Sequence, residues 1–150
     1  MKIAIATDHA GFPIKDFIIR VTRELGHETI DLGTCSTEPV DYPDMARLIA
    51  ASLQKGQSER AIFVCGSGVG ACIAANKFRG IRAGTCHDTF SAHQGVEDDA
   101  CNVLCLGARV IGTQLAGELV RTFLRASFSG AERHARRVHK IMEIEAEGSR

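Results

Sequence analysis

The residue with the clearest chemical potential is Cys65, which stands where an apolar run stops and a glycine-rich segment begins. Residues 61–64 are apolar, with aromatic and β-branched side chains, and predict a buried strand. Every second residue from 66 to 70 is glycine, which lets backbone N–H groups approach an anion closely. The alanine-rich residues 71–78 predict a helix whose positive end faces this turn. We therefore expect a thiolate on Cys65 beside a site for a negatively charged oxygen.

Other interpretations of this segment are weighed against that one. Gly66, Gly68 and Ala71 match the loose dinucleotide fingerprint G-x-G-x-x-G/A, but on a middle strand of a chain without room for a separate substrate domain. A cysteine phosphatase would carry an arginine where Ala71 stands. Ser67 is either a plain turn residue or a hydroxyl within reach of the same substrate oxygen. The remaining alternative is that Cys65 is a buried small hydrophobic residue.

Composition limits the classes of function. The 150 residues are enough for one domain, expected over residues 1–150, with a substantial core. The 18 basic and 18 acidic residues cancel, so no overall field favours binding to nucleic acid or to an anionic membrane. No apolar stretch predicts a membrane span or a signal peptide, so we expect a cytoplasmic protein. The six cysteines contain no C-x-x-C pair, which favours reduced, mostly buried thiols over disulfides or zinc ligands.

Short β-like runs alternate with longer helical ones, a pattern typical of a doubly wound parallel sheet covered on both faces. Strands are expected at 2–7, 27–32, 60–64, 81–86 and 102–106. Helices are expected at 12–25, 41–56, 71–78, 88–96, 112–124 and 131–147. Loops that follow parallel strands meet at one rim, which makes neighbours of Asp8, His9, Cys35, residues 65–68, residues 86–87 and residues 107–109.

Several charged residues allow both a structural and a functional interpretation. Asp8 fits a helix N-cap or a substrate ligand, and His9 a solvated loop or a site residue. Arg133 and Arg137 lie four residues apart on one helical face, where two guanidinium groups suit a phosphate. The alternative is a solvated face paired with Glu143, Glu145 and Glu147. The acidic residues 97–99 are more typical of an exposed loop than of a site.

Together these motifs resemble the type B ribose-5-phosphate isomerases, a family that includes galactose-6-phosphate isomerase subunits. The motifs, which span nearly the whole chain, are residues 8–12, 41–43, 65–70, 74–77, 80–83, 102–104, 107–110 and the Arg-His-x-x-Arg pattern at 133–137. The resemblance implies a Rossmann-like three-layer α/β/α fold with a five-stranded parallel sheet and a C-terminal helix. It also implies a homodimer with shared active sites, with a pair of dimers left open, and no metal or organic cofactor.

The resemblance further implies an isomerase that moves a proton between C1 and C2 of an open-chain sugar phosphate through a cis-enediolate. Cys65 would be the base, and Ser67 would assist transfer between the two oxygens. Asp8 would bind sugar hydroxyls, and Tyr42 would form a wall. The amides of Gly66, Gly68, Val69 and Gly70 would hold the negative oxygen. The residues expected at the sugar and phosphate, partly from the partner chain, are His9, Arg109, Arg133 and Arg137.

One departure from the family pattern concerns Asp98 and Asp99, which stand where ribose-5-phosphate isomerases of this type have a His-Asn pair. That histidine opens the furanose ring, so Asp98 or His93 would have to replace it. The expected substrate is ribose 5-phosphate, giving ribulose 5-phosphate. A tetrose 4-phosphate, which cannot close a furanose ring, or a hexose 6-phosphate is the alternative. In a different class, the chain would be a non-catalytic protein that binds sugar phosphates.

Overall fold

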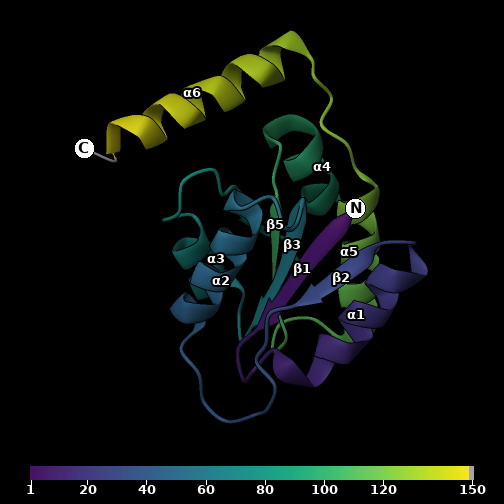
Figure 1. Ribbon diagram of the computed structural model, residues 1–150. Helices are drawn as coiled ribbons and strands as arrows, with labels where there is room; N and C mark the ends of the chain where they lie inside the picture. Colours follow the sequence, from purple (N-terminus) through teal and green to yellow (C-terminus); the bar gives the residue numbers. More distant parts are fainter. Residues whose placement is uncertain (149–150) are drawn as a thin grey trace.

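The computed structural model describes residues 1–148 and contains a parallel sheet in the order β2-β1-β3-β5-β4 (Figure 1). The strands are β1 (Lys2–Thr7), β2 (Glu28–Asp31), β3 (Arg60–Cys65), β4 (Ala83–Thr85) and β5 (Val103–Gly107). The helices are η1 (Phe12–Ile14), α1 (Lys15–Glu24), α2 (Tyr42–Gln54), α3 (Val69–Ala75), α4 (Thr89–Asp99), α5 (Thr113–Arg125) and α6 (Glu132–Gly148). The expected five-stranded, three-layer architecture is therefore confirmed.

Each face of the sheet carries its own apolar layer. Along β1, Ile3 and Ile5 face the layer formed with α1, α4 and α5, while Ala4 and Ala6 face the layer formed with α2 and α3. The same alternation continues along β3 and β5, whose inner residues are almost completely buried. Because both faces are covered, these strands read as continuous apolar runs rather than as alternating ones. The central strands thus form a rigid support for the loops at their ends.

Two helices differ from the sequence expectation in ways that matter for the site. α3 covers Val69–Ala75 rather than 71–78, so it begins directly after the glycine turn. α4 continues to Asp99 instead of stopping at 96, and it ends at Ala100, whose φ is 51°. The acidic residues 97–99 therefore form a last helical turn, not an exposed loop. The sequence pattern did not predict this turn, because residues 97–99 carry no apolar side chain that would continue the helical period.

The sheet has two chemically distinct ends. All strands run in one direction, so the loops after β1, β3 and β5 lie at the carboxyl end. α6 lies beyond the amino end (Figure 1), where Glu145 Oε1 accepts a hydrogen bond from the Gly80 N–H at 2.8 Å. A cavity of about 510 Å³ lies beside α6, lined by residues that include Arg82 and Asp99, which come just before β4 and β5. Residues of α6 and the carboxyl-end loops are thus at opposite ends of the sheet.

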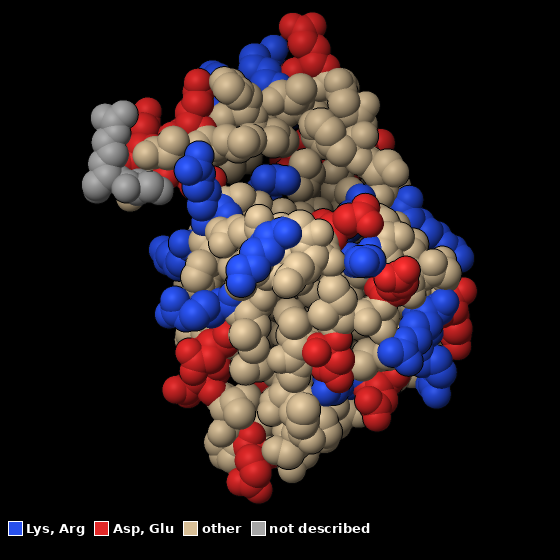
Figure 2. Space-filling view, viewed as in Figure 1, with Lys and Arg blue, Asp and Glu red and all other residues tan. Residues whose placement is uncertain are grey.

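The surface carries both signs of charge. Figure 2 shows Lys and Arg side chains interspersed with Asp and Glu over the face seen in Figure 1, in keeping with the 18 basic and 18 acidic residues. Across residues 1–148, no helix combines the length and the apolar character needed to cross a membrane.

Candidate active site

A cavity of about 340 Å³ opens at the carboxyl end of the sheet. Its walls come from the loops after β1, β3 and β5 and from the start of α2, as expected for the rim of a parallel sheet. The lining residues are Asp8, Tyr42, Cys65, Gly66, Ser67, Gly70, Arg109 and Val110. All of them except Val110 are residues that the sequence singled out. The structure therefore brings together the core of the expected site from four separate segments.

Cys65 is the last residue of β3 and is only 4% exposed, yet it lines this cavity. Its Sγ accepts a hydrogen bond from the backbone N–H of Gly68 at 3.1 Å. Gly68 has a φ of 82°, a conformation that favours glycine, and its carbonyl accepts a hydrogen bond from Thr85 Oγ1 at 3.1 Å. The turn is therefore held in a shape that aims an N–H group at the sulfur, where it stabilises negative charge.

The β3 and β5 loops are joined by backbone hydrogen bonds. The Ala108 N–H donates to the Cys65 carbonyl at 2.9 Å, and the Arg109 N–H donates to the Gly66 carbonyl at 3.0 Å. The loops approach so closely that a Cβ at Gly107 would lie 2.6 Å from the backbone of Ser67. As a result, Arg109 stands over the glycine turn, where its guanidinium can face a negatively charged oxygen in the cavity.

Asp8 serves the turn after β1 and also lines the cavity. Its Oδ1 accepts hydrogen bonds from the N–H groups of Ala10 and Gly11, both at 2.9 Å, and so holds the turn. The helix N-cap interpretation is wrong, because Gly11 stands at the N-cap of η1 and Ile14 at that of α1. Within residues 1–148 its Oδ2 accepts no hydrogen bond, which leaves that oxygen available to a ligand hydroxyl. His9 does not line the cavity, and its Nδ1 accepts a hydrogen bond from the Val40 N–H at 3.3 Å.

Two further side chains complete the wall. Tyr42, the first residue of α2, packs against the glycine turn, and a Cβ at Gly70 would lie 2.8 Å from its Cζ. Ser67 is exposed at the mouth, with its Oγ accepting a hydrogen bond from the Val69 N–H at 3.3 Å. Gly68 and Val69 belong to the same turn without lining the cavity. Tyr42 is therefore a wall, and Ser67, two residues after Cys65 in the sequence, brings a hydroxyl to the same cavity.

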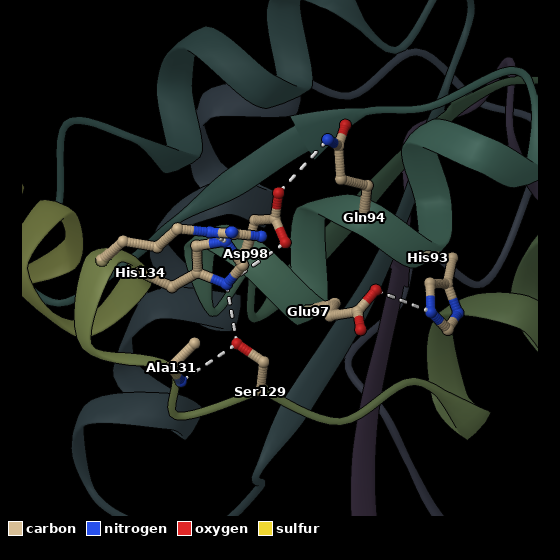
Figure 3. Close-up of polar contacts among 8 residues, drawn as sticks. His93, Gln94, Glu97, Asp98, Ser129, Ala131 and His134 are labelled. Atoms are coloured by element: carbon tan, nitrogen blue, oxygen red, sulfur yellow. Dashed lines mark hydrogen bonds and ion pairs between the residues drawn. The ribbon is translucent and has the colours of Figure 1, made fainter.

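The remaining candidates lie at the other end of the sheet, away from this cavity. Asp98 contacts His134 and Gln94 (Figure 3), and Asp99 lines the cavity beside α6. Arg133 and Arg137 are exposed on α6, and within residues 1–148 neither forms an ion pair. The solvated face that the sequence allowed is therefore confirmed, whereas its pairing with the glutamates is absent from residues 1–148. One copy of the chain does not bring these four residues to Cys65.

The other cysteines include a second unusual thiol. All six cysteines are free, and four of them are buried. A hydrogen bond from the Cys105 thiol, with others from Thr85 and Asn76, lowers the pKa of Cys72 to about 6, although partial burial opposes the shift. No sequence pattern indicates this contact, because Cys72 lies in an alanine-rich segment. Among the described residues, no group of three or more His, Cys, Asp or Glu side chains is arranged to hold a metal ion.

Further groups support the site. The expected meeting of residues 86–87 with residues 107–109 is confirmed, because His87 Nε2 accepts a hydrogen bond from the Gly107 N–H at 3.0 Å and so fixes the start of the loop that carries Arg109. Val110 lines the cavity, although the sequence marked it only as part of the motif 107–110. His134 is 4% exposed and holds Asp98 and Arg133. Its place inside the Arg-His-x-x-Arg motif was the only available signal.

Comparison with known proteins places this geometry in a family. The family model described as Ribose/Galactose Isomerase matches residues 3–141. Ribose-5-phosphate isomerase B of Escherichia coli is 44% identical, with 96% of each chain covered. D-erythrulose-4-phosphate isomerase of Pectobacterium atrosepticum is 40% identical, with 94% of this chain and 93% of that protein covered. A solved structure of Clostridium thermocellum ribose-5-phosphate isomerase B superimposes with a TM-score of 0.95 at 45% identity, covering 98% of this chain and 99% of that one. The chain therefore belongs to the ribose/galactose isomerase family of aldose–ketose isomerases.

Proposed function

We propose that this chain interconverts ribose 5-phosphate and ribulose 5-phosphate, with Cys65 as the base. The observation that carries the proposal is the position of the thiol, which lines the carboxyl-end cavity while its sulfur accepts the Gly68 N–H at 3.1 Å. The Cys65 thiolate removes the C2 proton of the open-chain aldose, which leaves a cis-enediolate and a neutral thiol. The thiol then returns the proton to C1, and the product is the ketose.

The surrounding groups have matching roles in this proposal. The hydroxyl of Ser67 passes a proton between O1 and O2 of the enediolate. Arg109 and the N–H groups of the glycine turn stabilise the negative oxygen. Asp8 Oδ2 accepts a hydrogen bond from a sugar hydroxyl, and Tyr42 covers the bound chain. His9, at the edge of the site, contributes to sugar binding.

The proposal includes a second copy of the chain. Arg133 and Arg137 lie on α6 beyond the amino end of the sheet, whereas Cys65 lies at the carboxyl end. Both arginines are exposed, and no carboxylate within residues 1–148 neutralises them by an ion pair. They bind the phosphate of a substrate held in the partner's cavity, so that each site is shared in a homodimer. Asp98 and Asp99 approach the partner's cavity from the same direction.

A second substrate is favoured by the contacts of Asp98. This residue stands where ribose-5-phosphate isomerases have the ring-opening histidine, and its Oδ1 and Oδ2 are engaged by His134 and Gln94. A tetrose 4-phosphate has its O4 blocked and cannot form a furanose ring, so its isomerase needs no ring-opening acid. One relative with 40% identity is a D-erythrulose-4-phosphate isomerase. A tetrose 4-phosphate is therefore the alternative substrate.

The test is ketose formation by the purified protein from ribose 5-phosphate, erythrose 4-phosphate and allose 6-phosphate, with kcat/KM measured for each. The highest value on ribose 5-phosphate supports the leading assignment, and the highest value on erythrose 4-phosphate supports the alternative. Turnover of allose 6-phosphate alone would exclude both. Binding of the three sugars without any ketose would instead identify a non-catalytic sugar-phosphate-binding protein.

A further inference from the structure

A series of polar contacts runs from α4 through His134 to the guanidinium of Arg133. Figure 3 shows Asp98 between Gln94 and His134. Gln94 Nε2 donates to Asp98 Oδ2 at 3.2 Å, and Asp98 Oδ1 lies 3.3 Å from His134 Nδ1. On the other side of the imidazole, Arg133 Nε donates to His134 Nε2 at 2.9 Å. A single residue, His134, therefore links Asp98 to the guanidinium of Arg133, which the proposed function assigns to the substrate phosphate.

The protonation of His134 follows from its partners. Arg133 Nε can only donate, so His134 Nε2 must be an acceptor and the ring proton must lie on Nδ1. The hydrogen-bond partner of Nδ1 is Ser129 Oγ at 2.7 Å, and Asp98 Oδ1 lies 3.3 Å from the same nitrogen. A carboxylate this close to Nδ1 favours a proton there, which is the one tautomer that can hold Arg133.

Burial limits the freedom of the side chains in this contact. The side chain of His134 is 5% exposed and that of Asp98 is 24% exposed, so neither is a freely solvated group. The neighbouring backbone reinforces the contact, because the Ser129 N–H donates to the Glu97 carbonyl at 3.0 Å. Arg133 uses only its Nε in this contact, which leaves the two terminal nitrogens of its fork for an anion.

We propose that Asp98 is a positioning residue for phosphate binding: through His134 it fixes the orientation of the Arg133 guanidinium. This inference rests on the proposed function, which gives Arg133 the substrate phosphate. Asp98 then contributes to affinity for the phosphorylated end of the substrate rather than to proton transfer. Asp98, which stands in the place of the family's ring-opening histidine, thus positions Arg133 through contacts within a single chain.

The experiment measures kcat, KM and the dissociation constant of inorganic phosphate for Asp98→Ala, Arg133→Ala and the double variant. A hydrogen bond to a charged group, here the one between Arg133 and His134, is worth about a factor of ten in binding. Asp98→Ala removes the charge that supports this bond, so it should raise KM and the phosphate dissociation constant up to about tenfold with kcat little changed. On the Arg133→Ala background the Asp98 change should add nothing further, because its effect passes through Arg133.

Two matched variants separate positioning from a general structural effect. Glu97→Gln removes a carboxylate from the neighbouring ion pair with His93, which is 3.1 Å long and also spans one turn of α4, and it should leave phosphate binding unchanged. Asp98→Asn keeps an oxygen that can accept the Nδ1 proton, so it should weaken phosphate binding less than Asp98→Ala. If Asp98→Ala does not fold, His134→Phe, which removes the acceptor for Arg133, should give the same tenfold loss.

The outcomes distinguish this inference from the proposed function. If Arg133→Ala leaves the phosphate dissociation constant unchanged, Arg133 does not bind phosphate. The proposed phosphate site and this inference would then both be wrong. A loss with Arg133→Ala but none with Asp98→Ala or His134→Phe would overturn the inference alone. A fall in kcat at constant KM for Asp98→Ala, or equal effects with and without Arg133, would also overturn it.

Discussion

At the scale of single residues, the cavity chemistry depends on how one thiol differs from five others. Cys65 lines the carboxyl-end cavity and accepts a backbone N–H, whereas Cys86, Cys101 and Cys105 are buried away from it. Burial raises the pKa of Cys86 to about 12 and that of Cys101 to about 11, so these two remain neutral thiols at ordinary pH. The proposal that Cys65 is the base therefore rests on its place in the cavity, which these three thiols do not share.

Replacing Cys65 with alanine is expected to abolish turnover while the fold and sugar-phosphate binding are kept. A positioned acid–base group contributes about 10²–10⁴-fold to rate, and Ser67→Ala should slow the reaction less than Cys65→Ala does. The control is Cys72→Ala, which removes a partly exposed cysteine outside the cavity. Steady-state assays check this, and near-normal turnover by Cys65→Ala would show that the base is elsewhere.

Cys72 leads to a prediction about pH. Its pKa is lowered to about 6, so its thiolate is present above that pH and is lost as the pH falls through it. In a Cys65→Ala background, alkylation of Cys72 by iodoacetamide should stay fast at pH 7 and decline with a midpoint near 6. An ordinary thiol has a pKa of about 8.5 and would already be slow at pH 7. Mass spectrometry of the modified peptide gives the profile, and a midpoint above 8 would contradict the assignment.

At the scale of elements, the loop after β1 is fixed by its contact with β3. A Cβ at Gly11 would lie 2.2 Å from the Val64 carbonyl oxygen, which is a rigid backbone atom in a central strand. The same carbonyl accepts the Asp8 N–H at 3.1 Å. The loop therefore cannot move away without losing the position of the Asp8 carboxylate in the cavity.

Substituting Gly11 with alanine should consequently lower the free energy of unfolding by about 1–3 kcal/mol, the usual cost of inserting an atom into a tightly packed place. Gly95→Ala is the matched control, because its Cβ would only make an ordinary contact 3.6 Å from Cys101. There the loss of a helical glycine should stabilise the protein by about 0.5–1 kcal/mol. Urea denaturation measures both, and equal effects of the two changes would refute the packing argument.

Most of the elements, and the residues around Cys65, could be predicted because both depend on local patterns. Strand β1 appears at its expected bounds, 2–7, since an apolar run stops at a polar turn. The last turn of α4 could not be predicted, because none of residues 97–99 has an apolar side chain that would continue the helical pattern. The position of Arg133 could not be predicted either: a helical period gives the face of α6 but not the end of the sheet against which that face lies.

At the scale of the whole molecule, the proposed site is divided between two ends of the sheet. Cys65 and Arg109 lie at the carboxyl end, and Arg133 and Arg137 lie on α6 beyond the amino end. A dimer with a two-fold axis repeats every contact, so it would complete two sites at once. One copy would supply the thiol of a site, and the other its phosphate-binding arginines.

Hybrid dimers test this division. In a purified hybrid of a Cys65→Ala chain with an Arg137→Ala chain, one of the two sites should be intact, and kcat/KM should recover to about half of the native value. In the matched hybrid, a native chain is paired with a chain that carries both changes, and no intact site should remain. The reverse pattern, with activity only in the second hybrid, would mean that each site is built from a single chain.

The side chain of Asn76 bears on whether two molecules can pair through the edges of their sheets. β4 is only three residues long and forms one edge of the sheet. Asn76 caps Ala83 on that edge, because its Oδ1 accepts the Ala83 N–H at 2.8 Å and its Nδ2 donates to the Ala83 carbonyl at 2.9 Å. An open strand edge is a template on which a foreign strand can pair. A carboxamide that occupies both backbone groups of Ala83, as a neighbouring strand would, should therefore disfavour edge-to-edge pairing at this position.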